Sequence, residues 1–164
     1  MVVSKGARSS RPRVIYWNNI PAPYMVERFD AVVRRGNIDL EAWFGARTEP
    51  DRSWTIDESA WQFPHRYLPR VGIGGHGLSL PMPALTARRP DLLVSLYATP
   101  SFLGGLRIAW LRGWRTALWV EVTFDFWIRR RRWKEALKRA VFRRVDGIIT
   151  AGQDGRAFAM QYGV

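Results

Sequence analysis

The chain has 164 residues, 47% of them hydrophobic, which predicts a single folded domain and excludes a largely disordered protein. It has no cysteine and only two histidines, His65 and His76, so disulfide bonds, thiolate metal sites, a cysteine nucleophile and a histidine-rich metal centre are excluded. The formal net charge of +12 points to partners that carry negative charge.

The sequence has no apolar run close to the roughly 20 residues that a membrane-spanning helix requires. Residues 1–12 are basic and serine-rich but lack the apolar core of a signal peptide. We therefore expect a disordered basic leader ahead of a domain that covers residues 13–164, in a cytoplasmic protein.

The first predicted unit is a strand near Val14–Trp17 that leads through a proline-containing loop into a helix over Tyr24–Arg35. Gly36 follows two arginines and is a typical helix stop. A second strand is expected near Leu40–Phe44. These elements are the start of an alternating strand–helix pattern.

The next stretch is less regular. Gln62–Leu68 predicts a short strand, and Pro64 places it at the edge of a sheet. The glycine-rich segment Val71–Gly77 does not fit a phosphate-binding loop motif, so we expect a flexible loop over the cleft in which His76 is exposed to solvent. Phosphate binding by the loop and an acceptor contact of His76 are the alternatives. A short helix is expected over Met82–Arg88.

The regular pattern returns in the last third, with buried strands over Leu92–Leu96 and Thr116–Val122 and a final strand over Gly147–Thr150. Helices are expected over Ser101–Leu111 and Arg131–Val145. In the second of these, one apolar stripe is predicted to pack on the core, with Phe142 outside it: Trp133, Ala136, Leu137, Ala140, Val141 and Val145.

Strands that alternate with helices predict an α/β fold, a Rossmann-like parallel sheet with helices on both faces. Ligands of such sheets bind in the loops at the carboxyl ends of the strands. Four loops are therefore the candidates for a binding site: Asn18–Tyr24, Tyr97–Ser101, Glu121–Phe126 and Ala151–Asp154.

Polar side chains in these loops are the candidate site residues. Glu121 and Asp125 are candidate catalytic carboxylates, as a general base or an anchor for a hydroxyl group, and a salt bridge to neighbouring arginines is the alternative for Glu121. The candidate substrate-binding residues are Asn18, Asn19, Tyr24, Tyr97, Thr99, Thr123 and Gly152. For the two asparagines, ordinary turn chemistry remains an equal alternative.

Several motifs resemble one enzyme family. The segments NIPAPY (19–24), RFDAV (28–32), IDLEAWF (38–44) and EPDRSW (49–54) resemble the start of family 4 glycosyltransferases, which have the GT-B fold. The segments KEALKRAVFRRVDGIITAG (134–152) and FAMQYGV (158–164) are similar to the last helix, strand and helix of that family's N-terminal domain.

This resemblance implies two Rossmann-like domains, of which the N-terminal one binds the acceptor and the C-terminal one the nucleotide sugar. The C-terminal donor domain, with its paired-glutamate motif, would be absent from this chain, so the chain alone is expected to be inactive. The implied acceptor is lipid-linked or a saccharide, the nucleotide sugar is a co-substrate rather than a cofactor, and no metal is expected.

A basic block over Arg129–Arg144 holds nine basic residues against one acidic residue. Aromatic residues precede it, which favours contact with an anionic membrane surface through Phe126, Trp127, Arg129, Arg130, Arg131 and Arg132. We therefore expect a peripheral protein at the inner face of the cell membrane; a solvated helix face is the alternative. A nucleic-acid-binding module, or a non-catalytic partner that completes a split enzyme, are the other functional hypotheses, although the block contains no recognisable nucleic-acid motif.

Overall fold

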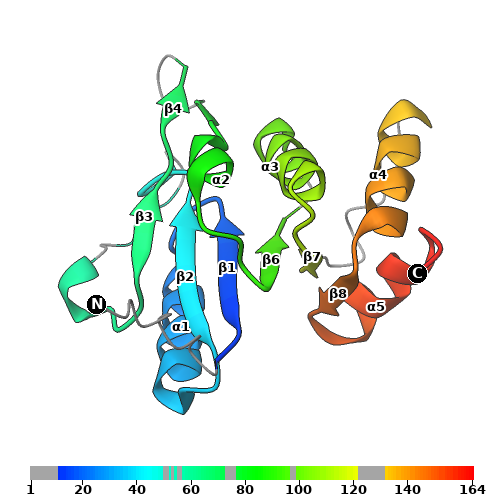
Figure 1. Ribbon diagram of the computed structural model, residues 1–164. Helices are drawn as coiled ribbons and strands as arrows, with labels where there is room; N and C mark the ends of the chain where they lie inside the picture. The colour runs from blue at the N-terminus through cyan, green and yellow to red at the C-terminus, as the bar shows by residue number, and fades with distance from the viewer. Residues whose placement is uncertain are drawn as a thin grey trace, which may run out of the picture.

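The protein folds into one six-stranded parallel sheet with helices on both faces, as the computed structural model shows in Figure 1. The structure describes residues 11–49, 52, 54, 57–72, 77–96, 99–121 and 132–164. The strands of the sheet are β1 (Arg13–Asn18), β2 (Asp39–Phe44), β3 (His65–Tyr67), β6 (Leu92–Ser95), β7 (Thr116–Val120) and β8 (Gly147–Thr150). The helices are α1 (Pro23–Arg35), α2 (Met82–Thr86), α3 (Pro100–Leu111), α4 (Arg132–Arg144) and α5 (Gly152–Met160), with a short 3₁₀ turn at Glu58–Ala60.

The strand order is β3-β2-β1-β6-β7-β8, and every neighbouring pair is parallel. This order confirms the predicted Rossmann-like fold. It also confirms that the two apolar strands of the last third, β6 and β7, are central and buried, and that the short strand with the preceding proline, β3, lies at an edge. β2 and β3 lie in sequence order on one side of β1, and β6, β7 and β8 lie in sequence order on its other side. The strand order therefore reverses between β1 and β6.

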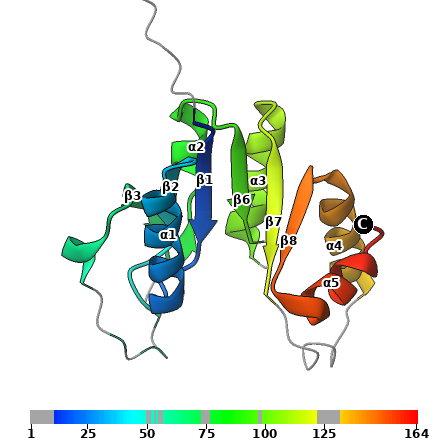
Figure 2. The same ribbon diagram turned by 90° about the horizontal axis from the view of Figure 1, so that it is seen from below.

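The alternation of β1 explains how the two faces are covered. Val14 and Tyr16 point to the face that α1 covers, where they pack with Phe29. Ile15 and Trp17 point to the opposite face, which α2 and α3 cover. Successive side chains of a strand point to opposite sides of a sheet, so a strand that is apolar throughout needs helices on both. Figure 2 shows α1 on one side of the strands and α3 on the other.

The far end of the sheet has its own core. Leu118 and Val120 of β7 pack there with α3, α4 and α5. The largest side chains of this cluster are the rings of Phe142, Phe158 and Tyr162, whose centroids lie 4.8–6.0 Å apart.

This packing corrects the predicted orientation of α4. Phe142 is buried beside Val141, whereas four members of the predicted packing stripe are exposed: Trp133, Ala136, Leu137 and Ala140. The aromatic cluster with α5 accounts for the difference, because the contact of Phe142 with two rings of another element was not visible in the periodicity of the helix alone.

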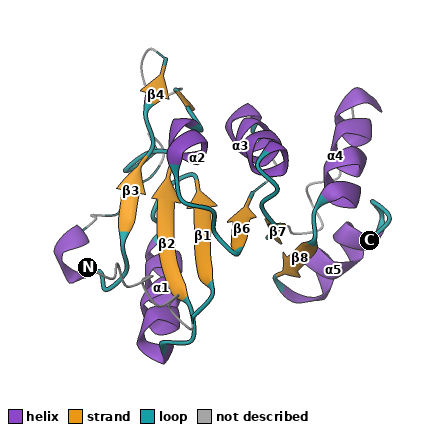
Figure 3. Cartoon of the chain, in the orientation of Figure 1, coloured by secondary structure: helices purple, strands orange, loops and turns teal. Residues whose placement is uncertain are grey.

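Two short strands that the sequence did not predict flank the glycine-rich stretch. A short antiparallel ribbon forms there from β4 (Arg70–Val71) and β5 (Leu78–Ser79), and it stands apart from the main sheet in Figure 3. Residues 73–76, which include His76, lie outside the described part of the chain. The side-chain hydroxyl of Ser79 donates to the carbonyl of Gly45 at 3.1 Å, which connects the ribbon to the end of β2.

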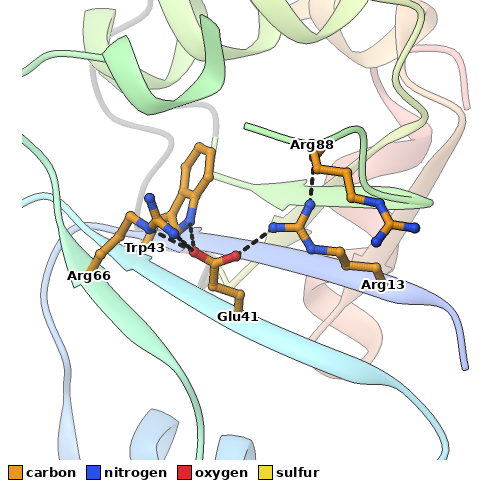
Figure 4. A network of polar contacts seen from close by, with 5 residues as sticks. All are labelled: Arg13, Glu41, Trp43, Arg66 and Arg88. Carbon is orange, nitrogen blue, oxygen red and sulfur yellow. Dashed lines mark hydrogen bonds and ion pairs between the residues drawn. The ribbon is translucent and has the colours of Figure 1, made fainter. Parts of the chain in front are cut away.

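On the α2 face of the sheet, the carboxylate of Glu41 forms hydrogen bonds with side chains of β1, β2 and β3 (Figure 4). Glu41 of β2 accepts hydrogen bonds from the guanidinium of Arg13 at 2.7 Å, from the indole of Trp43 at 2.9 Å and from Arg66 of β3 at 2.6 Å. Arg13 also donates to the carbonyl of Arg88. Burial acts to raise the pKa of Glu41, but the Trp43 hydrogen bond and the two arginines outweigh it and hold the pKa below its usual range.

Two adjacent glycines of α3 provide a matched test of the packing between α3 and β1. A Cβ added to Gly105 would overlap the buried ring of Trp17, whereas a Cβ on Gly104 would lie 3.6 Å from Pro81, an ordinary contact. We expect Gly105→Ala to lower the free energy of unfolding by about 1–3 kcal/mol or more through overpacking. Gly104→Ala should raise it by about 0.5–1 kcal/mol because alanine is the better helix former.

Urea denaturation measures both effects as shifts of the unfolding midpoint at unchanged slope. Equal midpoints for the two variants would contradict the close approach of α3 to Trp17.

Candidate functional site

A pocket of about 410 Å³ opens at the carboxyl ends of the central strands. Its walls come from the end of β1 and the loop after it, from the start of α1, from the loop after β2 and from the residues that end β6 and β7. The lining residues are Tyr16, Asn18, Asn19, Ile20, Ala22, Tyr24, Met25, Glu49, Arg52, Trp54, Leu96, Trp119 and Glu121. The pocket therefore lies where the strand order reverses, the usual ligand position in this kind of sheet.

The loop after β1 is shaped by its backbone hydrogen bonds and prolines. The carbonyls of Asn18 and Asn19 accept hydrogen bonds from the amides of Gly45 and Ala46 at 3.0 and 2.8 Å, which joins the ends of β1 and β2. The side chain of Asn18 accepts from the amide of Asn19 at 2.8 Å. Pro23 then begins α1, since its fixed φ suits the first helical turn.

Glu121 follows β7 directly and is held from the other side of the pocket by α1. Its carboxylate pairs with the guanidinium of Arg28 at 2.7 Å and accepts a hydrogen bond from the hydroxyl of Tyr24 at 3.2 Å. The same guanidinium lies over the rings of Tyr24 and Trp119, at 5.2 and 5.5 Å from their centroids. One arginine thus orients both the carboxylate and two aromatic walls.

Two tyrosines near this carboxylate are held in the protonated form. Burial raises the pKa of Tyr16 well above its ordinary value, and the negative charge of Glu121 raises it further. Burial and Glu121 likewise raise the pKa of Tyr24. Both phenols therefore remain hydrogen-bond donors at any physiological pH.

Three donors in the wall of the pocket have no hydrogen-bond acceptor among the described residues. They are the hydroxyl of Tyr16 and the indole N–H groups of Trp54 and Trp119. Buried donors are normally paired, so unpaired ones at a pocket mark positions where a ligand can supply acceptors. Two other unpaired indoles, those of Trp17 and Trp114, belong to the core of the opposite face and do not line the pocket.

Of the predicted site residues, the structure brings four to this pocket: Asn18, Asn19, Tyr24 and Glu121. Thr99, which precedes α3, and Gly152, which begins α5, do not line it. Tyr97, Thr123 and Asp125 lie outside the described residues, as do Phe126, Trp127 and Arg129 to Arg131 of the predicted membrane-binding set. Arg132 begins α4 and is exposed.

Sequence reasoning missed Arg28, Tyr16 and the two tryptophans of the pocket. Tyr16 lies two residues before the end of β1, Trp119 lies one residue before the end of β7, and both point to the α1 face. Their positions near the strand ends, together with the alternation of side chains along a strand, could have placed them beside the carboxyl edge of the sheet. The pairing of Arg28 with Glu121 joins residues 93 positions apart, and no local pattern reports such a contact.

The chain matches no protein-family model, and a comparison with curated proteins found no match either. In the described part of the chain, no helix is long and apolar enough to cross a membrane. Among the same residues, no group of three or more His, Asp or Glu side chains is placed to hold a metal ion.

The coupling between Tyr24 and Glu121 predicts a measurable change in titration. We expect the pKa of Tyr24 to lie above 10 in the parent protein and to fall in Glu121→Gln, because the variant removes the negative charge and leaves Arg28 to favour the phenolate. Carbon NMR of the five labelled tyrosines across a pH titration measures this directly.

Tyr67 is the matched control, since its pKa is raised by burial and by a hydrogen bond to Glu58 rather than to Glu121. A Tyr24 pKa that stays unchanged in Glu121→Gln would show that the Tyr24–Glu121 contact is not formed in solution. A Tyr67 pKa that falls with it would show that the substitution acts on the whole domain and not through that contact.

Proposed function

We propose that this chain is the acceptor-binding half of a glycosyltransferase. In this proposal the pocket holds a sugar-bearing acceptor, either lipid-linked or a polysaccharide, and a nucleotide sugar provides the sugar that is transferred. The nucleotide sugar would be bound mainly by a second domain or a second chain that faces the carboxyl edge of the sheet. The observation that carries the proposal is the pocket at the strand-order reversal, where aromatic walls surround unpaired donors and an oriented carboxylate.

The chemistry of the pocket suits a saccharide. Sugars present apolar C–H faces and rings of hydroxyl groups that both donate and accept hydrogen bonds. The rings of Tyr16, Tyr24, Trp54 and Trp119 provide apolar surfaces, and three of them carry the unpaired donors described above. Asn19 adds a carboxamide that can donate and accept at once.

Glu121 is proposed to anchor the acceptor hydroxyl that reacts. Its two oxygens are oriented by Arg28 and Tyr24, and a carboxylate has further lone pairs with which it accepts a hydrogen bond from a ligand hydroxyl. In the transfer, the acceptor oxygen bonds to the anomeric carbon of the donor sugar as the bond from that carbon to the nucleoside diphosphate breaks. A hydroxyl held by Glu121 has its lone pairs free for this attack while its proton is directed to the carboxylate.

Turnover of the enzyme that contains both halves tests this assignment. Glu121→Gln should lower turnover at least tenfold, equivalent to roughly 1.4 kcal/mol of barrier, because a neutral amide neither pairs with Arg28 nor attracts the hydroxyl proton as strongly. Glu27→Gln is the matched control: Glu27 is an exposed residue of α1 next to Arg28, and its variant should keep the parent rate. Parent rates in Glu121→Gln would reduce Glu121 to a structural role.

A further inference from the structure

The outward face of α4 is apolar where a solvated helix should be polar. Trp133 and Leu137 are 60% and 40% exposed, and the small side chains of Ala136 and Ala140 are exposed between them. These four residues follow the three- and four-residue spacing of one helix face. In Figures 1 and 2, α4 lies at the end of the molecule opposite β3, beyond β8.

The inward face of the same helix holds it in this orientation. Val141 and Phe142 are buried, and Glu135 accepts a hydrogen bond at 2.7 Å from the hydroxyl of Tyr162, which follows α5. Lys138 pairs with Glu135 at 3.1 Å. The apolar stripe is therefore outside because polar and aromatic contacts fix the opposite side of the helix, and a rotation that buried Trp133 would break them.

The charges of α4 are arranged around this stripe. Arg132, Arg139 and Arg143 are exposed at spacings of seven and four residues, which places them on one flank of the stripe. Lys134 and Arg144 are exposed as well. Glu135 is the one acidic residue of the helix and belongs to the inward face, so the outward face carries cations alone.

We propose that α4 docks the protein on an anionic membrane surface. Trp133 and Leu137 would enter the boundary between headgroups and acyl chains, and the arginines on the flank would pair with lipid phosphates. A helix that joins an apolar stripe with tryptophan to a cationic surround is the usual form of an interfacial membrane contact. Nucleic acid would also attract the cations, but Leu137 and the two alanines at the centre of the face offer it neither charge nor a stacking surface.

This contact has a defined place relative to the pocket. Because β7 and β8 are parallel, α4 has to run back from the carboxyl edge of the sheet to its amino edge, so Arg132 and Trp133 lie near the edge where the pocket opens. Of the residues that the sequence suggested for membrane contact, Arg132 is the one that lies within the described part of the chain, and it flanks this face. The inference is carried by α4 itself and does not depend on the proposed glycosyl transfer.

Vesicle sedimentation with the full chain tests the proposal. The parent protein should bind vesicles of equimolar phosphatidylcholine and phosphatidylglycerol, bind pure phosphatidylcholine weakly, and be released by high salt. The apolar variant Trp133→Ser/Leu137→Ser should lose at least tenfold in affinity for the anionic vesicles. The charge variant Arg139→Gln/Arg143→Gln should lose roughly fivefold for each cation removed.

Two matched controls distinguish binding through this face from non-specific binding by any exposed apolar or basic residue. Leu111→Ser removes an exposed apolar side chain of α3, and Arg34→Gln/Arg35→Gln removes a basic pair at the end of α1. Both should bind vesicles as the parent does. All the α4 side chains changed are exposed, so thermal midpoints should stay close to that of the parent, and Trp133→Ser alone serves if the double variant does not fold.

Three results would overturn the proposal. The first is parent-level vesicle binding in the apolar variant with loss of both vesicle and RNA binding in the charge variant, which would indicate a polyanion site. The second is no vesicle binding together with a concentration-dependent dimer that the apolar variant abolishes, which would indicate a second copy of the chain. The third is equal loss of vesicle binding in the controls. Loss of turnover in Glu121→Gln with intact vesicle binding would leave the two proposals separate.

Discussion

The hydrogen-bonded pairing of β1 with both β2 and β6 is the constraint on which the rest of the structure depends. Each pair is parallel, so each connection has to cross a face of the sheet: the chain leaves β1 through α1 to reach β2, returns from β3 through α2 to β6, and then passes through α3 to β7. α1 is thereby placed on one face, and α2 and α3 on the other. The pocket opens where the strand order reverses, at the carboxyl ends of β1 and β6.

The ion pair between Arg28 and Glu121 completes this space. It connects the second turn of α1 to the residue that follows β7. β6 separates β7 from β1, the strand that leads into α1, so the ion pair joins parts of the chain that are not neighbours in the sheet. Both side chains remain partly exposed, at 48% and 31%, so the pair contributes little to the stability of the fold in comparison with the apolar core. Its effect is to orient a carboxylate and two aromatic rings at one ligand-sized opening.

Much of the sheet could be predicted from the sequence, because its central strands are apolar on both faces and are bounded by turn residues. The expected bounds of the last strand, Gly147–Thr150, agree with β8, and Gly36 ends α1 with the positive φ of 66° that favours glycine. Asn18, Asn19, Tyr24 and Glu121 reach one pocket through the same topology, since parallel strands end at the same edge, whereas Thr99, from another of the candidate loops, does not line it.

The parts that could not be predicted depend on contacts between distant segments. The orientation of α4 was predicted wrongly because two apolar faces compete in that helix, and the rings of Phe158 on α5 and of Tyr162 just after it decide between them. The β4–β5 ribbon is only two residues long in each strand, too short to give an alternating pattern. Arg28 is one of 26 basic residues, and nothing local distinguishes it from the others.

The central claim is that the pocket binds a saccharide through donors that are unpaired in the free protein. NMR of the indole N–H groups during titration with oligosaccharides measures this most directly, because a new acceptor shifts the proton signal of the indole downfield. The account predicts saturable downfield shifts for Trp54 and Trp119, none for the equally unpaired Trp17 and Trp114 in the opposite core, and little effect of nucleotide sugars on any of them. Shifts confined to other residues, or tight binding of a nucleotide sugar at this pocket, would contradict the account.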